Sequence, residues 1–298
     1  MSFIILFLAF HLEAITYKPH VWPELEYGNE SDWEDSFFFI QMADCQLGCF
    51  DNNTSWQKEI SLLDAAVVHI NRLRPRFVIL CGDMVHAFPG TPMRAAETAA
   101  YKKVVSKIDR TIPLICLCGN HDVGNTPIPW SILRFEAEFN APHYFSFWVG
   151  GVQGIVLNSS LISDPSQAGP LYIEQLNWFK QQLAVRVNGH PPVHRLVFSH
   201  HPWFLKSATE ADNYYVIPKA RRIPFLDMMK QSGVTAAFCG HYHRNSYGTY
   251  QGMPVITTSA IGRPLGSDPS GFRIVKVYHN RIEHAYYGLS KVPTRVAL

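Results

Sequence analysis

The chain has 298 residues, of which 47% are hydrophobic and 13% aromatic, a composition typical of a folded globular protein and not of a disordered or fibrous one. Lys and Arg total 26 and Asp and Glu total 24, so the formal net charge is only +2. This balance excludes a general electrostatic attraction to nucleic acid, and we predict no nucleic-acid partner. The 14 histidines indicate metal-binding or proton-transfer chemistry.

The N-terminal segment contains an apolar run at residues 3–10, which is too short to span a bilayer. No basic residue precedes the run, and residues 12–14 form a poor cleavage site, so we predict neither a cleaved signal nor a stable membrane anchor. The six cysteines lack the spacing of a disulfide framework. We therefore predict a cytoplasmic protein, with secretion as the alternative if residues 1–14 are a cleaved signal.

Strand-like apolar runs alternate with segments of helical periodicity over the first half of the chain. In order, the sequence predicts a strand at residues 37–43, a helix between Trp56 and Pro75, a strand at 77–81, a helix at 101–110 and a strand at 113–118. The first of these helices is the best supported, because its apolar residues recur three and four positions apart.

The second half begins with a predicted hairpin and ends in a β-rich segment. Gly150 and Gly151 separate two apolar runs, at residues 144–149 and 152–157, which is the signal of a two-residue turn. In order, there follow a helix at 173–187, a strand at 195–199, a helix at 223–231 and strands at 234–239, 255–258, 272–277 and 282–287. Because no flexible linker divides this stretch, we predict a single α/β domain with mixed sheets.

Five of the predicted strand ends carry side chains of the types that bind metals. The groups are Asp44-x-Gln46, Gly82-Asp83, Gly119-Asn120-His121-Asp122, His200-His201-Pro202 and Gly240-His241-Tyr242-His243. Residues two apart in an extended segment share a face, so we expect Asp44 and Gln46 to point to one centre. Each group alone has an ordinary structural explanation, but five in succession predict one metal site at the carboxyl ends of the strands.

The order of these groups resembles the signature of the calcineurin-like metallophosphoesterases. The similarity includes the surroundings of Gly82-Asp83 and the hairpin at 144–151, and it extends over roughly residues 33–288. It implies a four-layer α/β/β/α sandwich of two mixed sheets, with one domain at residues 33–290. Residues 1–32 would form an N-terminal segment of uncertain structure.

The resemblance also implies a centre of two metal ions. Carried over residue by residue, the first metal would take Asp44, Gln46 and His243, the second Asn120, His200 and His241, and Asp83 would bridge them. The mixed oxygen and nitrogen donors suit Mn, Fe or Zn, and Mg is a further candidate. His200 is preferred over His201 as the metal ligand, because the family's ligand stands two residues before the proline.

Gln46 is a departure from the family, which usually has His at that position. A Gln carbonyl oxygen is a weaker and harder donor than imidazole, so we expect it to loosen the first metal or to favour Mn or Mg.

Such a centre predicts hydrolysis of a phosphomonoester by a hydroxide activated between the two metals. We expect His121 to protonate the leaving oxygen, since it lies next to a predicted ligand without being one. Asp122 is predicted either to orient His121 through a hydrogen bond or to cap the turn. The resemblance implies a serine/threonine protein phosphatase that acts on phosphoproteins.

Two alternative functions stay open. A nucleotidase or cyclic-nucleotide phosphodiesterase would need aromatic side chains that stack on a base, and the candidates are Phe88, Trp203, Tyr214 and Tyr215. The other alternative is a non-catalytic scaffold that binds metal, and the nearly complete set of ligand types argues against it.

Arg244, directly after the last predicted ligand, either binds a substrate phosphate or is an ordinary solvated arginine.

Overall fold

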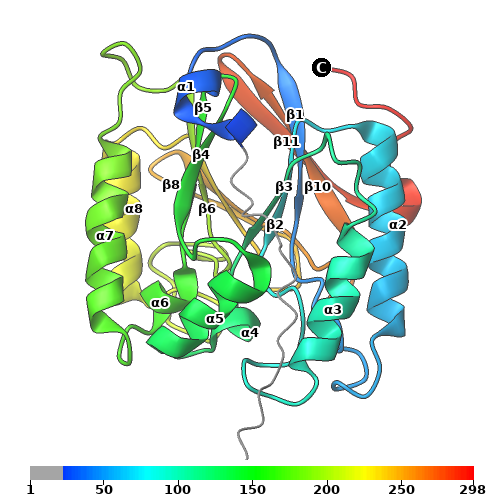
Figure 1. The fold of residues 1–298 in the computed structure, drawn as a ribbon. Helices are drawn as coiled ribbons and strands as arrows, with labels where there is room; N and C mark the ends of the chain where they lie inside the picture. The colour runs from blue at the N-terminus through cyan, green and yellow to red at the C-terminus, as the bar shows by residue number, and fades with distance from the viewer. Residues whose placement is uncertain (1–22) are drawn as a thin grey trace, which may run out of the picture.

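Two mixed β-sheets pack face to face in the computed structural model, which describes residues 23–298, and helices cover the outer face of each sheet (Figure 1). The predicted α/β/β/α sandwich is therefore confirmed. The predictions for the apolar run at residues 3–10 and for a signal at 1–14 lie outside the described residues. From residue 23 to residue 298, no helix is both long enough and apolar enough to cross a bilayer.

Strands and helices alternate along much of the described chain, which ends in a run of strands. The strands are β1 (Phe37–Met42), β2 (Val78–Cys81), β3 (Leu114–Leu117), β4 (Phe145–Val149), β5 (Val152–Val156), β6 (His194–Phe198), β7 (Ala236–Cys239), β8 (Ser246–Tyr250), β9 (Met253–Thr257), β10 (Gly271–Tyr278) and β11 (Arg281–Gly288). The helices are α1 (Tyr27–Glu30), α2 (Gln57–Leu73), α3 (Arg94–Val105), α4 (Asn120–Val123), α5 (Pro129–Phe139), α6 (Ser159–Ser163), α7 (Gly169–Leu183) and α8 (Lys219–Gln231), with short 3-10 turns η1 (Pro23–Leu25) and η2 (Leu289–Lys291).

Both sheets have a run of parallel strands, joined by antiparallel strands at one edge of the first sheet and at both edges of the second. The first has the order β11-β10-β1-β2-β3, in which β1, β2 and β3 are parallel. The second has the order β4-β5-β6-β7-β9-β8, in which β5, β6, β7 and β9 are parallel. Since parallel strands end at the same edge of a sheet, the loops after these strands gather on one side of the molecule.

A cluster of aromatic side chains fills the space between the two sheets. Phe39 on β1 stacks on Phe77 with ring centres 4.6 Å apart, and it contacts Phe198 and Phe238 of the other sheet edge-on at 5.9 and 5.7 Å. Ile40 is the next residue on β1, and it packs on the opposite face, under the helices. This period-2 alternation is what allows one strand to contribute to two cores.

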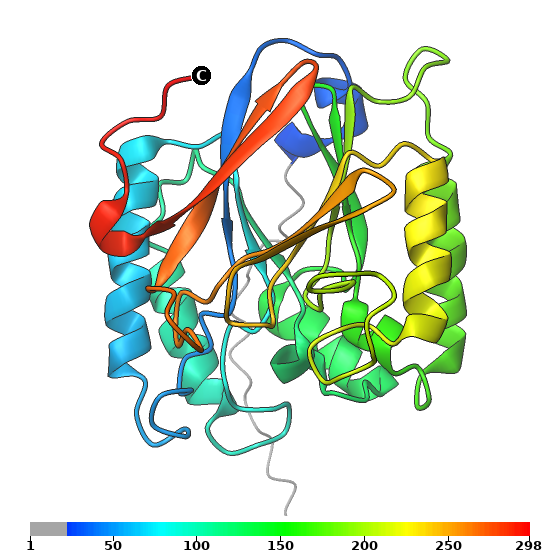
Figure 2. The same cartoon turned by 180° about the vertical axis from the view of Figure 1, so that it is seen from behind.

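The outer layers are formed by helices α2 and α3 on the first sheet and α7 and α8 on the second, as Figures 1 and 2 show. The stripe predicted for α2 is confirmed, because Leu63, Val67, Ile70 and Leu73 are all buried against the sheet. The predicted hairpin is confirmed as β4 and β5, and both turn glycines have positive φ, as that turn requires.

Several helices differ from the sequence-based prediction, and for α3 and α5 the reason is identifiable. Helix α3 begins at Arg94 and ends at Val105, so it starts earlier than predicted and stops short of residue 110. Its start was missed because its first turns bury Arg94 and Glu97 and so lack an apolar stripe. Helix α5 was not predicted. Its buried residues Ile132 and Phe135 have helical spacing, but the neighbouring Leu133 is 64% exposed and obscures the pattern.

The contacts of Phe39 lead to a testable prediction about stability. Replacing this fully buried side chain in Phe39→Ala leaves a cavity between the sheets, and the free energy of unfolding is expected to fall by about 3–5 kcal/mol. The matched change Leu133→Ala, at an exposed position, is expected to alter it by less than about 0.5 kcal/mol. Urea titration measures both values. A similar loss in the two variants would contradict the assignment of Phe39 to the core between the sheets.

Candidate metal centre

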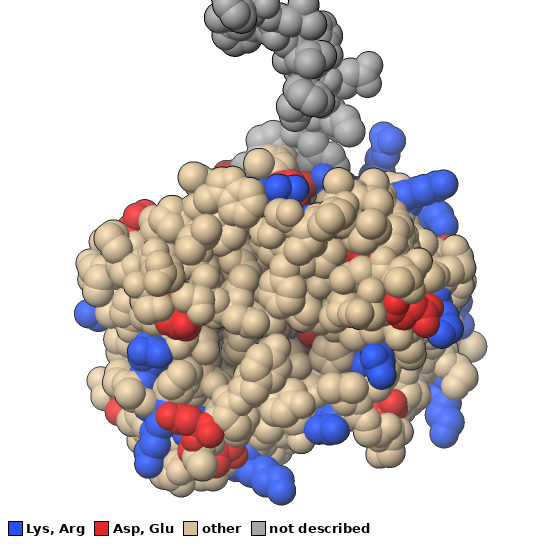
Figure 3. Space-filling view, turned by 90° about the horizontal axis from the view of Figure 1, so that it is seen from below, with Lys and Arg blue, Asp and Glu red and all other residues tan. Residues whose placement is uncertain are grey.

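The loops after β1, β2, β3, β6 and β7 meet at the lower edge of the sandwich in Figure 1. Seen from that side in Figure 3, the molecule is hollowed near its centre, and charged side chains lie mainly around the periphery. A cavity of about 170 Å³ opens there, and Gln46, Asp83, His121, His241 and His243 contribute to its walls. The structure thus brings residues from strand ends far apart in sequence to one place.

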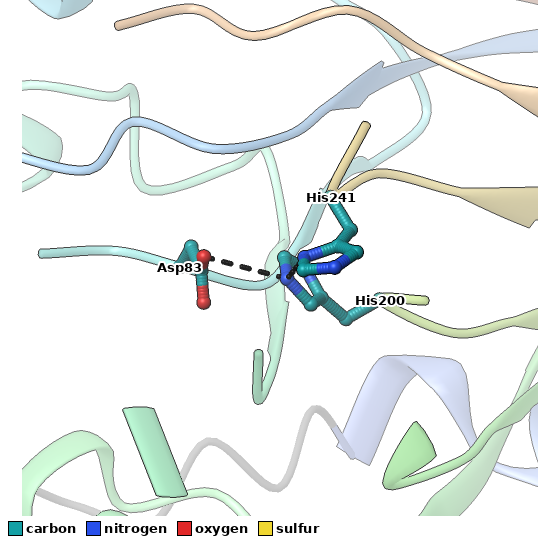
Figure 4. Close-up of side chains that lie close together, drawn as sticks. All are labelled: Asp83, His200 and His241. Carbon is teal, nitrogen blue, oxygen red and sulfur yellow. Dashed lines mark hydrogen bonds and ion pairs between the residues drawn. The ribbon is translucent and has the colours of Figure 1, made fainter. Parts of the chain in front are cut away.

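Donor atoms of the second predicted metal converge around His200. Its Nε2 lies 2.9 Å from Asn120 Oδ1, 3.1 Å from His241 Nδ1 and 3.4 Å from Asp83 Oδ2. Figure 4 shows Asp83, His200 and His241, each of which offers a ligand atom within 4.8 Å of the others. Metal–ligand bonds of about 2.0–2.2 Å place neighbouring donors about 3 Å apart, so the spacing fits a bound cation.

The donors of the first predicted metal lie directly beside this group. Asp44 Oδ1 is 3.3 Å from His243 Nε2, and the Gln46 side chain donates to Asp83 Oδ2 at 3.3 Å. Asp44 Oδ1 and Gln46 Oε1 are both buried without a hydrogen-bond partner among the described residues. Because a buried oxygen without a partner is costly, two such atoms at one site fit a cation that both can bind.

Backbone carbonyls fix the direction of the three histidine rings. His200 Nδ1 donates to the carbonyl of Cys81 at 2.8 Å, and His243 Nδ1 donates to that of Arg263 at 2.6 Å. His241 Nε2 donates to the carbonyl of Tyr214 at 3.1 Å. A carbonyl can only accept, so the proton of each neutral ring stays on that nitrogen. The second nitrogen faces the centre and offers its lone pair to a metal once the ring is neutral, as in metal-bound histidines.

Backbone conformation at the site differs from the extended geometry expected from the sequence. Strand β1 ends at Met42, and five of the predicted ligands have a left-handed backbone: Asp44, Gln46, Asp83, His241 and His243, with φ between 40° and 67°. The expectation that paired ligands share a face of a strand is therefore wrong. Left-handed residues other than glycine cost roughly 1 kcal/mol each and concentrate at functional sites.

Asp83 keeps its negative charge in spite of its burial. Burial by itself raises the pKa of Asp83, but the imidazoles of His200 and His121 hold it well below the ordinary value. Burial also lowers the pKa of His200, yet the charges of Asp83 and Asp44 raise it on balance to about 9. Burial and the charge of His200 lower the pKa of His241 to about 4. A metal ion that binds here therefore competes with the proton on His200 for the charge of Asp83.

His121 lies in the cavity wall in a fixed orientation. Its ring is stacked between His86 and Phe88, with ring centres 4.7 and 4.3 Å away. Nδ1 donates to the carbonyl of His86 at 2.5 Å, and the backbone N–H donates to Asp83 Oδ1 at 2.9 Å. No hydrogen bond to the remaining ring nitrogen, Nε2, is found among residues 23–298.

Asp122 does not make the bond to His121 that one of the two predictions assumed. Its Oδ2 accepts the backbone N–H groups of Asp83 at 2.7 Å and Gly119 at 2.9 Å, and its Oδ1 lies 3.5 Å from Arg94 Nη2. Arg94 is fully buried and also donates to the carbonyl of His121 at 2.8 Å. Asp122 thus fastens the turn after β3 to Asp83, which is the alternative role of a turn-capping carboxylate.

The aromatic candidates for base stacking differ in position. Tyr214 and Tyr215 line the cavity, and Tyr214 is 59% exposed. Trp203 is fully buried against Phe225, so it is excluded as a contact for a substrate. Phe88 stacks on His121 and is only partly accessible.

Of two arginines near the site, the one that the sequence suggested lies outside the cavity wall, and the other lies in it. The guanidinium of Arg244 lies 5.0 Å from the ring centre of Tyr242 and does not line the cavity, whereas Arg263 does. Arg263 was missed because it follows no strand-end motif, and only the folded chain places it beside Asp44.

Comparison with known proteins agrees with this geometry. The family described as "Calcineurin-like phosphoesterase" matches residues 39–245. The chain belongs to the calcineurin-like phosphoesterase family. The human protein named serine/threonine-protein phosphatase CPPED1 is 42% identical over 275 residues, which is 88% of this chain and 87% of that protein. The Mycobacterium tuberculosis protein named cAMP/cGMP dual specificity phosphodiesterase MT0825 is 24% identical over 229 residues, which is 72% of this chain and 66% of that protein.

Among solved structures, the dimetal phosphatase LOC 393393 from Danio rerio superposes with a TM-score of 0.62 at 18% identity, over 86% of this chain and 97% of that one. This likeness confirms the fold of calcineurin-like phosphoesterases.

The close approach of the turns after β2 and β3 leads to a second prediction. A Cβ at Gly119 would lie 2.1 Å from Asp83 Oδ1, so Gly119→Ala must displace that carboxylate. We expect the variant to lose most of the Mn²⁺ that the wild-type protein retains after gel filtration, measured by elemental analysis. Gly169→Ala is the matched control, because nothing lies within 4 Å of the added atom. Retention of metal by Gly119→Ala would contradict the central place given to Asp83.

Proposed function

We propose that this protein is a two-metal serine/threonine protein phosphatase. The observation that carries the proposal is the convergence of seven donor side chains, two of them with unpartnered buried oxygens, beside a fixed histidine that is not one of the donors. The proposed ligands are Asp44, Gln46 and His243 for one ion, Asn120, His200 and His241 for the other, and Asp83 between them.

Two ions bound there would supply Lewis acidity that activates water and neutralises charge on a phosphoryl group. Mn, Fe, Zn and Mg all accept this mixture of oxygen and nitrogen donors, and the neutral oxygen of Gln46 favours Mn or Mg over Zn in its half of the site. The three proposed histidine ligands are held in place by backbone carbonyls, so their rings need little reorganisation when a metal binds.

His121 is proposed to act as the imidazolium, donating its Nε2 proton to the leaving oxygen of the substrate and keeping its Nδ1 proton in the bond to the His86 carbonyl. Its Nδ1 is fixed on the His86 carbonyl, and its backbone N–H is fixed on Asp83, so the ring cannot turn away. Asp122 is proposed as a positioning residue, because it holds the backbone of both Asp83 and Gly119 through its Oδ2.

The proposed substrates are phosphoproteins with phosphoserine or phosphothreonine. Support comes from the similarity to the protein named serine/threonine-protein phosphatase CPPED1 over nearly the whole length of both chains.

We further propose that the catalytic domain spans residues 33–290, which encloses the family match and all strands of both sheets. We also propose a cytoplasmic location, supported by the balanced composition and by six cysteines without a disulfide.

A cyclic-nucleotide phosphodiesterase is the second candidate function. The specific observation in its favour is Tyr214, an exposed ring at the mouth of the cavity on which a base could stack. Its ring centre is 4.9 Å from that of His241. The relative named as a phosphodiesterase adds support for this alternative.

One assay distinguishes these functions. Metal-free protein is supplied with Mn, Mg, Fe or Zn and tested on p-nitrophenyl phosphate, on bis(p-nitrophenyl) phosphate, on cyclic AMP and on a phosphoserine peptide. We expect metal-dependent turnover of the monoester and the peptide, with none in Asp83→Asn and normal turnover in the control Asp64→Asn, which changes an exposed ion pair. Preference for cyclic AMP would favour the alternative, and metal binding without turnover would indicate a scaffold.

The role of His121 leads to a separate prediction. His121→Ala is expected to keep its metal and to lose turnover by about 10²-fold, because only the proton donor is removed. His279→Ala, at an exposed position in the turn between β10 and β11, serves as a control that should match the wild type. Elemental analysis and initial rates provide the two readouts. Loss of metal in His121→Ala would mean that the residue acts on the metal site and not on the leaving group.

A further inference from the structure

The cavity at the metal centre has a basic side chain at its rim that no motif identifies. Arg263 lines this cavity together with His121 and His243. One end of its guanidinium is fastened, because Nη1 donates to the carbonyl of Cys49 at 3.1 Å. The guanidinium carbon also lies 5.9 Å from the ring centre of Phe50. These contacts hold a positive charge at the edge of the site.

The backbone around Arg263 is tied to the proposed ligands on both sides. The N–H of Gly262 donates to the carbonyl of Asp44 at 3.0 Å, and the N–H of Leu265 donates to that of His243 at 2.8 Å. The carbonyl of Arg263 in turn accepts from His243 Nδ1. The position of this arginine is therefore set by the same contacts that set the ligands, which is how a binding residue is pre-organised.

The guanidinium of Arg263 forms no ion pair with an acidic side chain among the described residues. None of the ion pairs found within residues 23–298 includes this residue. Its side chain is exposed at the rim, so its remaining N–H groups can meet a ligand that enters the cavity. A guanidinium matches the oxygens of a phosphoryl group because its donors lie in a planar fork.

We propose that Arg263 determines specificity at this site by binding the phosphoryl oxygens of a phosphomonoester. This inference rests on the proposed function and adds the residue that selects a monoester over a diester. A monoester carries about −1.5 to −2 charge at neutral pH and three terminal oxygens, of which a diester has lost one to its second ester bond. An arginine at the rim therefore gains a strong partner in the monoester and a weaker one in the diester.

Arg244 provides a matched control within the same chain. It is also an arginine beside a proposed ligand, but its guanidinium lies against the ring of Tyr242, outside the cavity wall. Removing its charge changes the local potential in a similar way without removing a group that can touch the phosphate.

The test uses the full chain with Mn²⁺ and three variants: Arg263→Gln, Arg263→Lys and Arg244→Gln. The Kd of inorganic phosphate is measured by calorimetry, and kcat/KM is measured for p-nitrophenyl phosphate and its bis ester. For Arg263→Gln we expect phosphate affinity and monoester kcat/KM to fall about 10- to 100-fold, with a change in the diester of less than about threefold. Arg263→Lys should recover part of the loss, and Arg244→Gln should match the wild type.

Two outcomes would overturn the inference. One is an Arg263→Gln variant that binds phosphate and discriminates the esters as the wild type does. The other is an equal loss on both esters together with loss of metal, which would show that the residue only supports His243. A wild-type protein that binds Mn²⁺ and phosphate but hydrolyses neither ester would refute the proposed function, and the phosphate affinities would still decide the role of Arg263.

Discussion

One buried carboxylate, that of Asp83, connects the strand ends on which this site is built. Its Oδ1 accepts the backbone N–H of His121, and its Oδ2 accepts from the Gln46 side chain and lies 3.4 Å from His200 Nε2. Its own N–H donates to Asp122. The turns after β1, β2, β3 and β6 are therefore fastened to a single residue, so the positions of the donors in both sheets depend on one another.

The sandwich supplies the rigidity that such an arrangement needs. Five proposed ligands have left-handed backbones, at a total cost of several kcal/mol, and this cost must be offset by the surrounding structure. The aromatic cluster around Phe39 joins the two sheets, and the parallel strands of each sheet end at one edge. Packing between the sheets thus contributes to function as well as to stability, because it keeps the two halves of the donor set in register.

The sequence was sufficient to predict an α/β domain with mixed sheets and the polar groups at its strand ends, because both depend on local patterns. The four-layer sandwich and the assignment of ligands to two metals came from the resemblance to a known family. Apolar runs marked the strands, and polar groups at their ends marked the edge where they meet. It was insufficient where a feature depends on tertiary contact: the buried Arg94 and Glu97 conceal the start of α3, and Arg263 reaches the cavity only through pairing of its segment with that of Asp44. The role of Asp122 was left between two alternatives, and only the positions of Asp83 and Gly119 favour one of them.

The most direct test of the central claim, that these donors form one centre for two cations around Asp83, is anomalous X-ray diffraction from crystals of the protein soaked in Mn²⁺ or Zn²⁺. We expect two peaks about 3.5–4 Å apart, with Asp83 between them, one beside Asp44, Gln46 and His243 and the other beside Asn120, His200 and His241. A single peak that leaves Asp44 and Gln46 without a metal, or peaks only at other places on the molecule, would contradict the two-cation centre.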